Sequence, residues 1–589
     1  MDFSTLPSIL RRMRRARFAI CCLVVGYLVA TPLRAADYEP NANPFGPLPG
    51  DSLPLPRAED MPALLTRGSE ESRSAPSFAE LETAGAIIGR VLIQPHDIFD
   101  LDDPKENNAL FRLANRLHVT TRPSVIARDV LFKPGDRVSV RVIDETERLL
   151  RSNRYLHEVQ IRPVNYRDGV VDIEVITRDT WSLDPGLSAS RAGGANSGRL
   201  SLRDYNLLGS GISAGVSYSS NVDRAGTELG FSDNHLFGNR TGIAYTYGVL
   251  DVGTVQAFSF GRPFYALDTP WAYGISASQT DALSTVYDKG AIASQYRSKV
   301  DNAEVYGGWS AGRVAGWVQR YSIGVNTQST QYMPQPDQPP PDRLPTDLIL
   351  TGPFMRYQIV EDIFEKVRNR DSIGTTEFFR LGLQSTLQLG RTYTGLGSTQ
   401  DAWLYAANVS KGLRLFAPNT LFLSASVSGR MNEGHRENQL ISGSFRYFMP
   451  HSERAQLLVS GAVDVYRQPD TPAPLQLGGD TGLRGYPLSY QSGERRSLFT
   501  VEERLYSDWY PWRLFRVGGA VFTDFGRAWN GPNESPGNNG ILADAGFGLR
   551  LLSARSAFGN VAHIDFAFPL NNRSDVRSVQ FLVTTKTSF

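Results

Sequence analysis

The sequence predicts a transmembrane antiparallel β-barrel that follows a small α/β domain. Between residues 183 and 589, segments of about ten residues alternate weakly between apolar and polar side chains, with turn residues between them, as membrane-spanning strands do. The chain holds 54 glycines, 24 tyrosines and 30 phenylalanines, which suits strands, turns and aromatic girdles. Mean hydropathy is −0.27, too low for a bundle of membrane helices. A barrel keeps this value low because only alternate residues face lipid.

Composition also excludes several classes of function. The chain of 589 residues is longer than one ordinary soluble domain. Its net charge of +1 does not show the excess of basic residues that is typical of nucleic-acid-binding proteins. The two cysteines, Cys21 and Cys22, both fall in a predicted targeting segment, so we expect neither disulfides nor thiolate metal sites in the mature chain. The seven histidines lack metal-ligand spacing. We therefore expect no metal and no cofactor.

The first 36 residues are predicted to be a secretory signal peptide. Arginines between residues 11 and 17 precede a short apolar run, Phe18 to Ala30, which is shorter than the roughly 20 residues of a spanning helix. Small residues, Ala35 and Ala36, lie near a plausible cleavage point. Residues 37–83 are rich in proline, serine and acidic residues without apolar periodicity, and predict a flexible linker.

Residues 84–182 predict a small α/β domain. A strand is expected at 87–93, followed by helical spacing at 108–117, 123–131 and 142–150. In the first helix, Leu110, Leu113, Ala114 and Leu117 share one face. Two further strands, 155–162 and 170–177, flank Arg167-Asp168-Gly169, which predicts a hairpin.

Residues 183–589 predict strand after strand, with the pattern allowing up to about 20 of them. Residues 331–351 contain six prolines, which no central strand tolerates, so we expect a long extracellular loop there. In the closing strands, every second residue from Ala562 to Leu570 is apolar, so that set should face lipid while His563 and Asp565 face the lumen.

One glycine-rich stretch, residues 477–487, has four glycines in the eight positions from Gly478 to Gly485. Such a stretch suits a tightly turning loop that passes close to other chain segments. It contains one cation, Arg484, which needs an anionic partner if it is buried. Asp524 lies on the inward face of an alternating segment about forty residues later and is the candidate partner.

These residues carry a resemblance to a known family. Leu483-Arg484-Gly485-Tyr486 resembles the loop motif of the BamA/TamA outer-membrane protein superfamily, and Phe522-x-Asp524-x-Gly526 resembles the strand motif that this loop contacts. The resemblance implies that the loop folds into the barrel lumen, with Arg484 paired to Asp524. It also implies 16 strands.

Three further residues extend the resemblance. Glu502 and Arg504 resemble the family's Glu-x-Arg strand pattern and imply a charge network in the lumen. Glu503 would then face lipid, which is costly unless it lies near the rim. The terminal Phe589 ends an alternating strand and resembles the signal by which barrels are recognised for assembly.

The order β-α-α-β-β in residues 84–182 resembles a POTRA domain, the periplasmic module of the same superfamily. The segments 131–136 and 148–155 match that module's layout, and there is room for one such domain. The resemblance implies a periplasmic domain whose sheet edge is able to bind a partner or an extended client by strand addition.

The resemblance implies a protein in the outer membrane of a bacterium that helps to insert, assemble or translocate other proteins. Its partners would be outer-membrane lipid and unfolded or nascent client proteins. Two alternatives stay open: a dedicated secretion or transport channel for one protein or lipid substrate, and a surface receptor barrel. Gly308-Trp-Ser310-Ala-Gly312 fits a nucleophile elbow in its letters but lies among alternating strands instead of at a strand-turn-helix. We therefore expect no enzyme.

Overall fold

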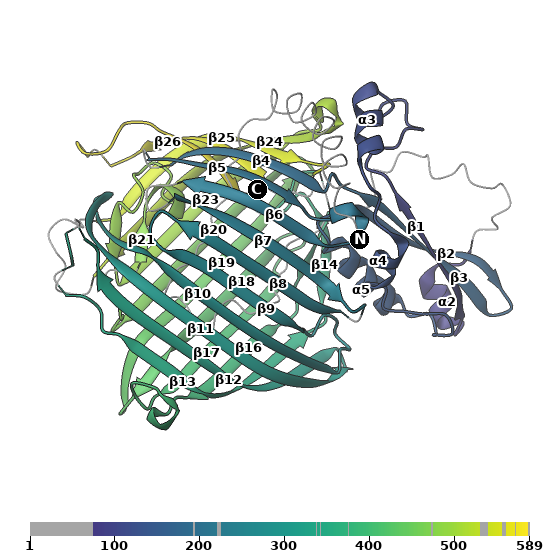
Figure 1. Cartoon of the computed structure of the whole chain (residues 1–589). Helices are drawn as coiled ribbons and strands as arrows, with labels where there is room; N and C mark the ends of the chain where they lie inside the picture. The colour runs from purple at the N-terminus through teal and green to yellow at the C-terminus, as the bar shows by residue number, and fades with distance from the viewer. Residues whose placement is uncertain are drawn as a thin grey trace, which may run out of the picture.

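A computed structural model describes residues 75–589, apart from 193–194, 221–224, 239, 337–338, 342, 375, 473–474, 531–539, 557–560, 572 and 587–589. An N-terminal domain (75–182) lies at one end of a large barrel (Figure 1). We call this end of the barrel proximal and the opposite end distal. The predicted signal peptide, the linker up to residue 74 and the terminal Phe589 lie outside the described residues.

The N-terminal domain is a three-stranded sheet covered by helices. The sheet has the order β1-β3-β2, in which β3 runs parallel to β1 and antiparallel to β2. The strands are β1 (Ile87–His96), β2 (Leu156–Arg167) and β3 (Val170–Asp179), and the helices are α2 (Phe78–Thr83), α3 (Ala109–Leu117), α4 (Pro123–Ala127) and α5 (Val140–Arg151). The chain order is thus α-β-α-α-α-β-β: a helix lies in each of the three segments with predicted helical spacing, and α2 is additional to them.

Helix α2 belongs to the domain core. Ser77 caps its N-terminus in a capping box with Glu80, and Leu81 is fully buried beside Ile88 and Val171. The prediction of a flexible linker as far as residue 83 is therefore wrong for its last residues, because the burial of Leu81 orders them.

The barrel of the described residues is closed and has 20 strands, with neighbours in chain order around the wall (Figure 1). This number agrees with the pattern-based expectation of up to about 20 strands, and the 16 strands implied by the resemblance are wrong. The wall strands are β4 (Leu183–Ala192), β5 (Ala195–Asp204), β6 (Ser213–Ser220), β7 (Ala225–Leu236), β8 (Thr241–Leu250), β9 (Thr254–Arg262), β10 (Trp271–Asp288), β11 (Ala291–Val314), β12 (Trp317–Pro334), β13 (Leu348–Glu361), β16 (Gln384–Arg391), β17 (Trp403–Arg414), β18 (Thr420–Asn432), β19 (His435–Ser452), β20 (Ala455–Arg467), β23 (Arg495–Tyr506), β24 (Phe515–Trp529), β25 (Leu542–Ser553), β26 (Val561–Pro569) and β27 (Gln580–Lys586).

The wall separates an apolar outer surface from a polar lumen. In β24, Val521 is 56% exposed on the outside, whereas Asp524 on the inner face is fully buried. In β26, Phe566 and Phe568 point outward while Asp565 points inward. Within the part of the chain that the structure describes, no helix is both long and apolar enough to cross a membrane.

Two pairs of short strands leave the wall. The first is the hairpin of β14 (Phe364–Arg368) and β15 (Thr376–Arg380), inserted between β13 and β16 at the proximal end. The second is β21 (Leu475–Leu477) with β22 (Gln491–Gly493), inserted between β20 and β23 at the distal end. The proline-rich connection also lies at the distal end and is shorter than predicted, because β12 continues to Pro334 and β13 begins at Leu348.

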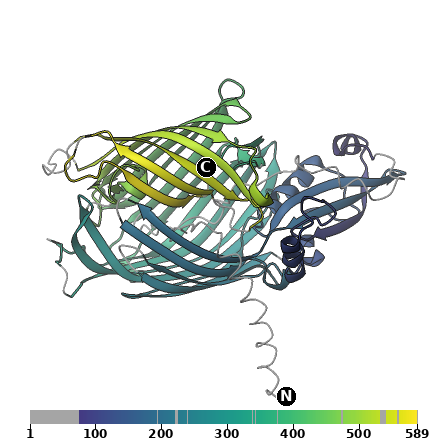
Figure 2. The same ribbon diagram turned by 90° about the horizontal axis from the view of Figure 1, so that it is seen from above.

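The N-terminal domain is fastened to the proximal turns by buried polar contacts. Asn206 donates from Nδ2 to Thr121 Oγ1 over 2.7 Å, and His235 Nε2 lies 2.8 Å from Asp129 Oδ1. Both barrel residues open turns of the same shape, Asn206-Leu-Leu-Gly209 and His235-Leu-Phe-Gly238, whose last two residues have positive φ. Figure 2 shows the domain at this end of the barrel.

Candidate functional site: a charge network in the lumen

Arg484 lies at the centre of a buried network of ion pairs. Its Nε and Nη2 donate to the two carboxylate oxygens of Asp524 over 2.8 and 3.0 Å, and its Nη1 donates to Glu502 over 2.9 Å. The guanidinium carbon lies 3.2 Å from the ring centroid of Phe522. A bidentate ion pair and stacking on an aromatic ring are two strong interactions of arginine. Together they hold the Arg484 side chain in one orientation.

The glycines of the loop allow it to come this close to the wall. At Gly485 a Cβ atom would lie 2.6 Å from the Cβ of Asp544, and the Gly485 amide donates to Asp544 Oδ2 over 2.9 Å. Gly482 has φ +119°, and a Cβ there would lie 2.2 Å from Leu498. Only glycine fits these two places without movement of the wall.

The remaining loop residues anchor it by packing. Leu483 and Tyr486 are fully buried in a cluster with Leu477 and Tyr490. The Tyr486 hydroxyl lies 2.8 Å from Asn571 Oδ1 and 3.0 Å from the carbonyl oxygen of residue 543. The loop is therefore part of the folded lumen and not a surface hairpin.

The strand motif faces the loop at every second position. Phe522 lies under the guanidinium, Asp524 binds it, and a Cβ on Gly526 would meet Leu477 of the loop at 3.0 Å. Thr500 of the neighbouring strand donates to Asp524 over 2.7 Å, which satisfies a further lone pair of the buried carboxylate. The structure thus brings both predicted motifs into one site.

Glu502 and Arg504 link this site to the proximal insertion. Glu502 accepts from Arg504 Nε over 3.0 Å and from Arg484, and both strand residues are at least 96% buried. Glu503, on the outer face between them, lies 3.5 Å from His451 near the proximal rim, where a charge is tolerated.

Sequence reasoning missed Arg550 as a member of the network. Arg550 is fully buried, and its Nη1 donates to Asp565 Oδ1 over 2.5 Å. Asp565 in turn lies 3.8 Å from Arg484. The alternation Leu549-Arg550-Leu551 placed the arginine on the face opposite its apolar neighbours. The sequence pattern did not identify the carboxylate that pairs with it.

The hairpin β14–β15 was also missed, and it occupies the proximal part of the lumen. At its tip Ile373 is fully buried in a cluster with Tyr506, Ala520, Leu552 and Val561 of the wall. Asp371 pairs with Arg446 of β19 over 2.8 Å, on another part of the wall. The tip therefore reaches between separate wall strands and fills the space between them.

Buried polar contacts hold the hairpin tip in shape. The Glu377 carboxylate accepts from the backbone amides of Arg370 and Asp371 over 2.9 and 3.0 Å. Arg370 donates to Glu365 over 2.8 Å and to Thr420 of the wall over 3.0 Å. Because these buried polar groups have hydrogen-bond partners, we expect the hairpin tip to keep one conformation.

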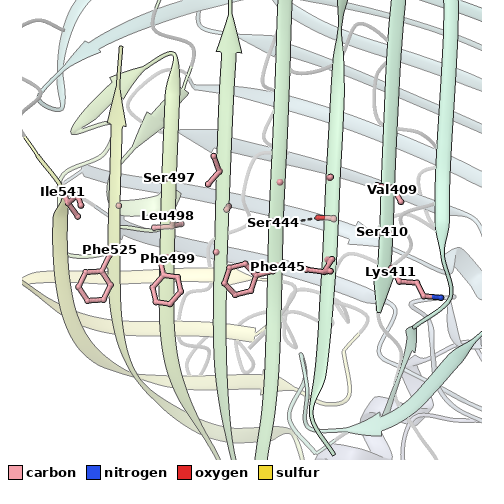
Figure 3. A pocket seen from close by; sticks show the side chains of 18 residues that line it. Val409, Ser410, Lys411, Ser444, Phe445, Ser497, Leu498, Phe499, Phe525 and Ile541 are labelled. Carbon is pink, nitrogen blue, oxygen red and sulfur yellow. Dashed lines mark hydrogen bonds between the residues drawn. The ribbon is translucent and has the colours of Figure 1, made fainter. Parts of the chain in front are cut away.

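The network holds the 477–487 loop against the barrel wall through buried ion pairs. Its carboxylates are occupied by arginines or backbone amides, and within the described ranges no group of three or more His, Cys, Asp or Glu side chains could hold a metal ion. A hollow on the wall is lined mostly by small and apolar residues of β17–β20, β23 and β24 (Figure 3). On the outer side of this hollow, the ring centroids of Phe445 and Phe499 lie 6.4 Å apart, one on each side of the strand that carries Gly461. Such a surface suits lipid acyl chains.

The solved structures that are similar to this chain include BamA and CdiB. BamA from Haemophilus ducreyi lacking POTRA domains 1–3 has 12% identity and TM-score 0.37, and the match covers 85% of each chain. CdiB from Acinetobacter baumannii has 13% identity, full coverage of both chains and TM-score 0.41. CdiB from Escherichia coli has 14% identity and TM-score 0.44, covering 85% of this chain and 76% of that one.

The chain is similar in structure to BamA and CdiB. BamA gives its name to the superfamily that the loop and strand motifs resemble. The copper transporter OprC is also similar, with 11% identity and TM-score 0.33, and the match covers 73% of this chain and 75% of that one. No protein-family model and no curated protein matches the chain.

Proposed function

We propose that this protein assists the insertion or translocation of other proteins at the outer membrane of a bacterium, with the N-terminal domain acting as a POTRA domain in the periplasm. The observation that carries the proposal is the seam of the barrel. Within the described residues, β27 and β4 pair at a single position, Val583 with Arg191, whereas β26 and β27 pair from Val561–Lys586 to Ala567–Gln580.

A weakly paired seam has a direct physical consequence. Among the described residues, opening it breaks few backbone hydrogen bonds, and the freed edges of β4 and β27 offer donors and acceptors to an incoming strand. The network around Arg484 holds β23, β24 and β26 from within, through Glu502, Asp524 and Asp565. These strands lie to one side of the seam, so the wall keeps its shape while the seam opens.

The experiment places the folded protein in liposomes and times the folding of an unfolded client barrel. Cysteines replace Val583 and Arg191 to lock the seam, and the matched control pairs Val583→Cys with Ile564→Cys, which joins β26 to β27 away from the seam. Cys21 and Cys22 are changed to serine in every version. We expect faster client folding that the seam lock abolishes and the control lock leaves intact.

Each outcome decides between functions. Acceleration that survives the seam lock contradicts templating at the seam. No acceleration with several clients contradicts an insertase and favours the second candidate, a dedicated channel for one protein or lipid substrate. The specific observation for that candidate is a wide 20-stranded barrel whose lumen holds two insertions that would have to move for transport.

A further inference from the structure

Helix α3 presents an apolar face that the described residues leave uncovered. Leu110, Leu113 and Leu117 are 53%, 38% and 39% exposed and share one side of the helix. The predicted face of α3 therefore points outward, and the helix instead buries Phe111. Asn115 fixes the helix to the domain by two hydrogen bonds with the backbone of Phe99. Three adjacent exposed leucines on an ordered helix mark a contact surface.

The fold places this helix at the proximal rim of the barrel. Phe111 belongs to a cluster that includes Leu514 of the β23–β24 turn. Glu106, just before the helix, pairs over 2.6 Å with Arg555 of the β25–β26 turn. Figure 1 shows α3 beyond the ends of β4, β24 and β25, which are strands near the seam. The leucine face is therefore held beside the outer edge of the wall.

Exposed apolar residues also lie after the helix and on the neighbouring barrel turns. After α3 comes Val119, which is 48% exposed, and the chain at Thr120 touches the β5–β6 turn at Gly209. Leu208 on that turn is 50% exposed. The β23–β24 turn, whose Leu514 packs in the Phe111 cluster, exposes Trp512 by 68%. Exposed tryptophan at the edge of an apolar wall is typical of a membrane–water interface.

The charges of the helix fit the same partner. Arg112 and Arg116 are exposed at the flank of the leucine face, and Arg513 lies on the neighbouring turn. A helix whose exposed leucines are flanked by arginines suits the plane of a membrane surface, where the leucines lie among the upper acyl chains and the arginines reach lipid phosphates.

We propose that α3, together with Val119, Leu208 and Trp512, is a membrane-surface anchor. It binds the phospholipid leaflet beside the proximal end of the barrel and holds the N-terminal domain against that leaflet next to the seam. The occupant of the leucine face is therefore lipid. The inference needs only a barrel that lies in a membrane, and it stands whether or not the barrel inserts clients.

The test places an environment-sensitive fluorophore on Leu113→Cys in the full-length protein, with Cys21 and Cys22 changed to serine. The protein is reconstituted into vesicles of phosphatidylethanolamine and phosphatidylglycerol. Quenching is measured with a lipid that carries a spin label near its headgroup and with aqueous iodide. The matched control is Val170→Cys, which is 42% exposed in the same domain, beside the β2–β3 turn.

We expect a blue-shifted emission at Leu113, quenching by the spin-labelled lipid and protection from iodide, with the opposite result at Val170. Iodide quenching at Leu113 equal to that at Val170 would overturn the proposal. Protection from both quenchers would also overturn it, because it means that protein covers the face. Changing Leu110 and Leu117 to glutamate in the labelled protein should abolish lipid quenching while the barrel stays folded, since both side chains are already exposed.

Discussion

Arg504 of the barrel wall donates a hydrogen bond of 2.7 Å to the carbonyl oxygen of Arg370, at the tip of the β14–β15 hairpin. The same Arg504 donates to Glu502, which also accepts from Arg484. One chain of buried charges therefore joins the insertion from the proximal end to the loop from the distal end. Movement of either insertion disturbs the other through two side chains of β23.

The first prediction concerns the hairpin as a plug. Replacing residues 364–380 by a short glycine-serine linker removes Ile373 and its packing on the wall. Because the hairpin fills the space between wall strands, its loss should raise the conductance of the reconstituted barrel in planar bilayers. Ile373→Asp should have a smaller effect in the same direction.

A control for the plug is Ile363→Asp, because Ile363 lies just before the hairpin and is 44% exposed. This variant should conduct like the wild type. If the linker variant folds into a barrel and conducts no better than the wild type, the hairpin does not block the lumen.

The second prediction concerns the Arg484–Asp524 pair. Arg484→Ala leaves Asp524 and Glu502 buried without their shared cation, so we expect a loss of about 3–5 kcal/mol in the free energy of unfolding. Asp524→Ala should cost a similar amount, and the double variant should cost clearly less than the sum. Urea unfolding in lipid vesicles measures all three.

The control for this cycle is Arg297, whose pair with Asp281 leaves the arginine side chain 38% exposed. Arg297→Ala should cost at most about 1 kcal/mol, because water screens exposed ion pairs. Simple additivity of Arg484→Ala and Asp524→Ala would show that the two side chains do not depend on one another.

The third prediction uses the close approach of the loop. Gly485→Ala pushes a methyl group to 2.6 Å from Asp544 Cβ on the wall, and it should destabilise the barrel by about 1–3 kcal/mol through overpacking. Gly307→Ala is the control, because a Cβ there meets nothing within 4 Å. Equal unfolding free energies for the two alanine variants would place the loop away from the wall.

The fourth prediction is a pH dependence of the N-terminal domain. Burial, with the nearby charges of Arg555 and Arg178, holds the pKa of His157 well below its usual value. The folded domain therefore keeps this histidine neutral, while the unfolded chain protonates it below about pH 6.5. The contribution of neutral His157 to the free energy of unfolding should be complete above about pH 6.5 and should fall as the pH drops below that value.

Thermal unfolding of the domain at pH 7.5 and pH 5.5 measures this effect. His157→Gln should flatten the pH dependence, since glutamine cannot take up the proton. His451→Gln serves as the control, because the His451 side chain is 45% exposed at the barrel rim and should leave the dependence unchanged. An undiminished pH response in the His157 variant would assign it to another group.

The sequence by itself determined the class of fold and the faces of the closing strands. Both depend on the period of two in a strand, which is a local property: Asp524 and Val521 must point to opposite sides whatever the rest of the chain does. Four glycines around Arg484 likewise indicated a tightly turning loop, and the family resemblance implied that this loop folds into the lumen.

The number of strands and the hairpin depended on contacts that the local pattern does not contain. The alternating pattern of residues 378–389 fits one strand, but the structure divides these residues between β15 and β16. Alternation is the same in a wall strand and in a hairpin that folds into the lumen, because both have one polar and one apolar face. Only the closure of the barrel decides which segment lines the wall.

The same limit explains Arg550 and helix α3. A buried arginine finds its partner on a neighbouring strand, and the register that brings Asp565 to it follows from how the sheet closes. In α3, helical spacing showed that the leucines share a face but not whether the protein covers it. Tertiary structure decided this, because the segment after β1 and Leu514 of a barrel turn bury the Phe111 side of the helix and leave its leucines outside.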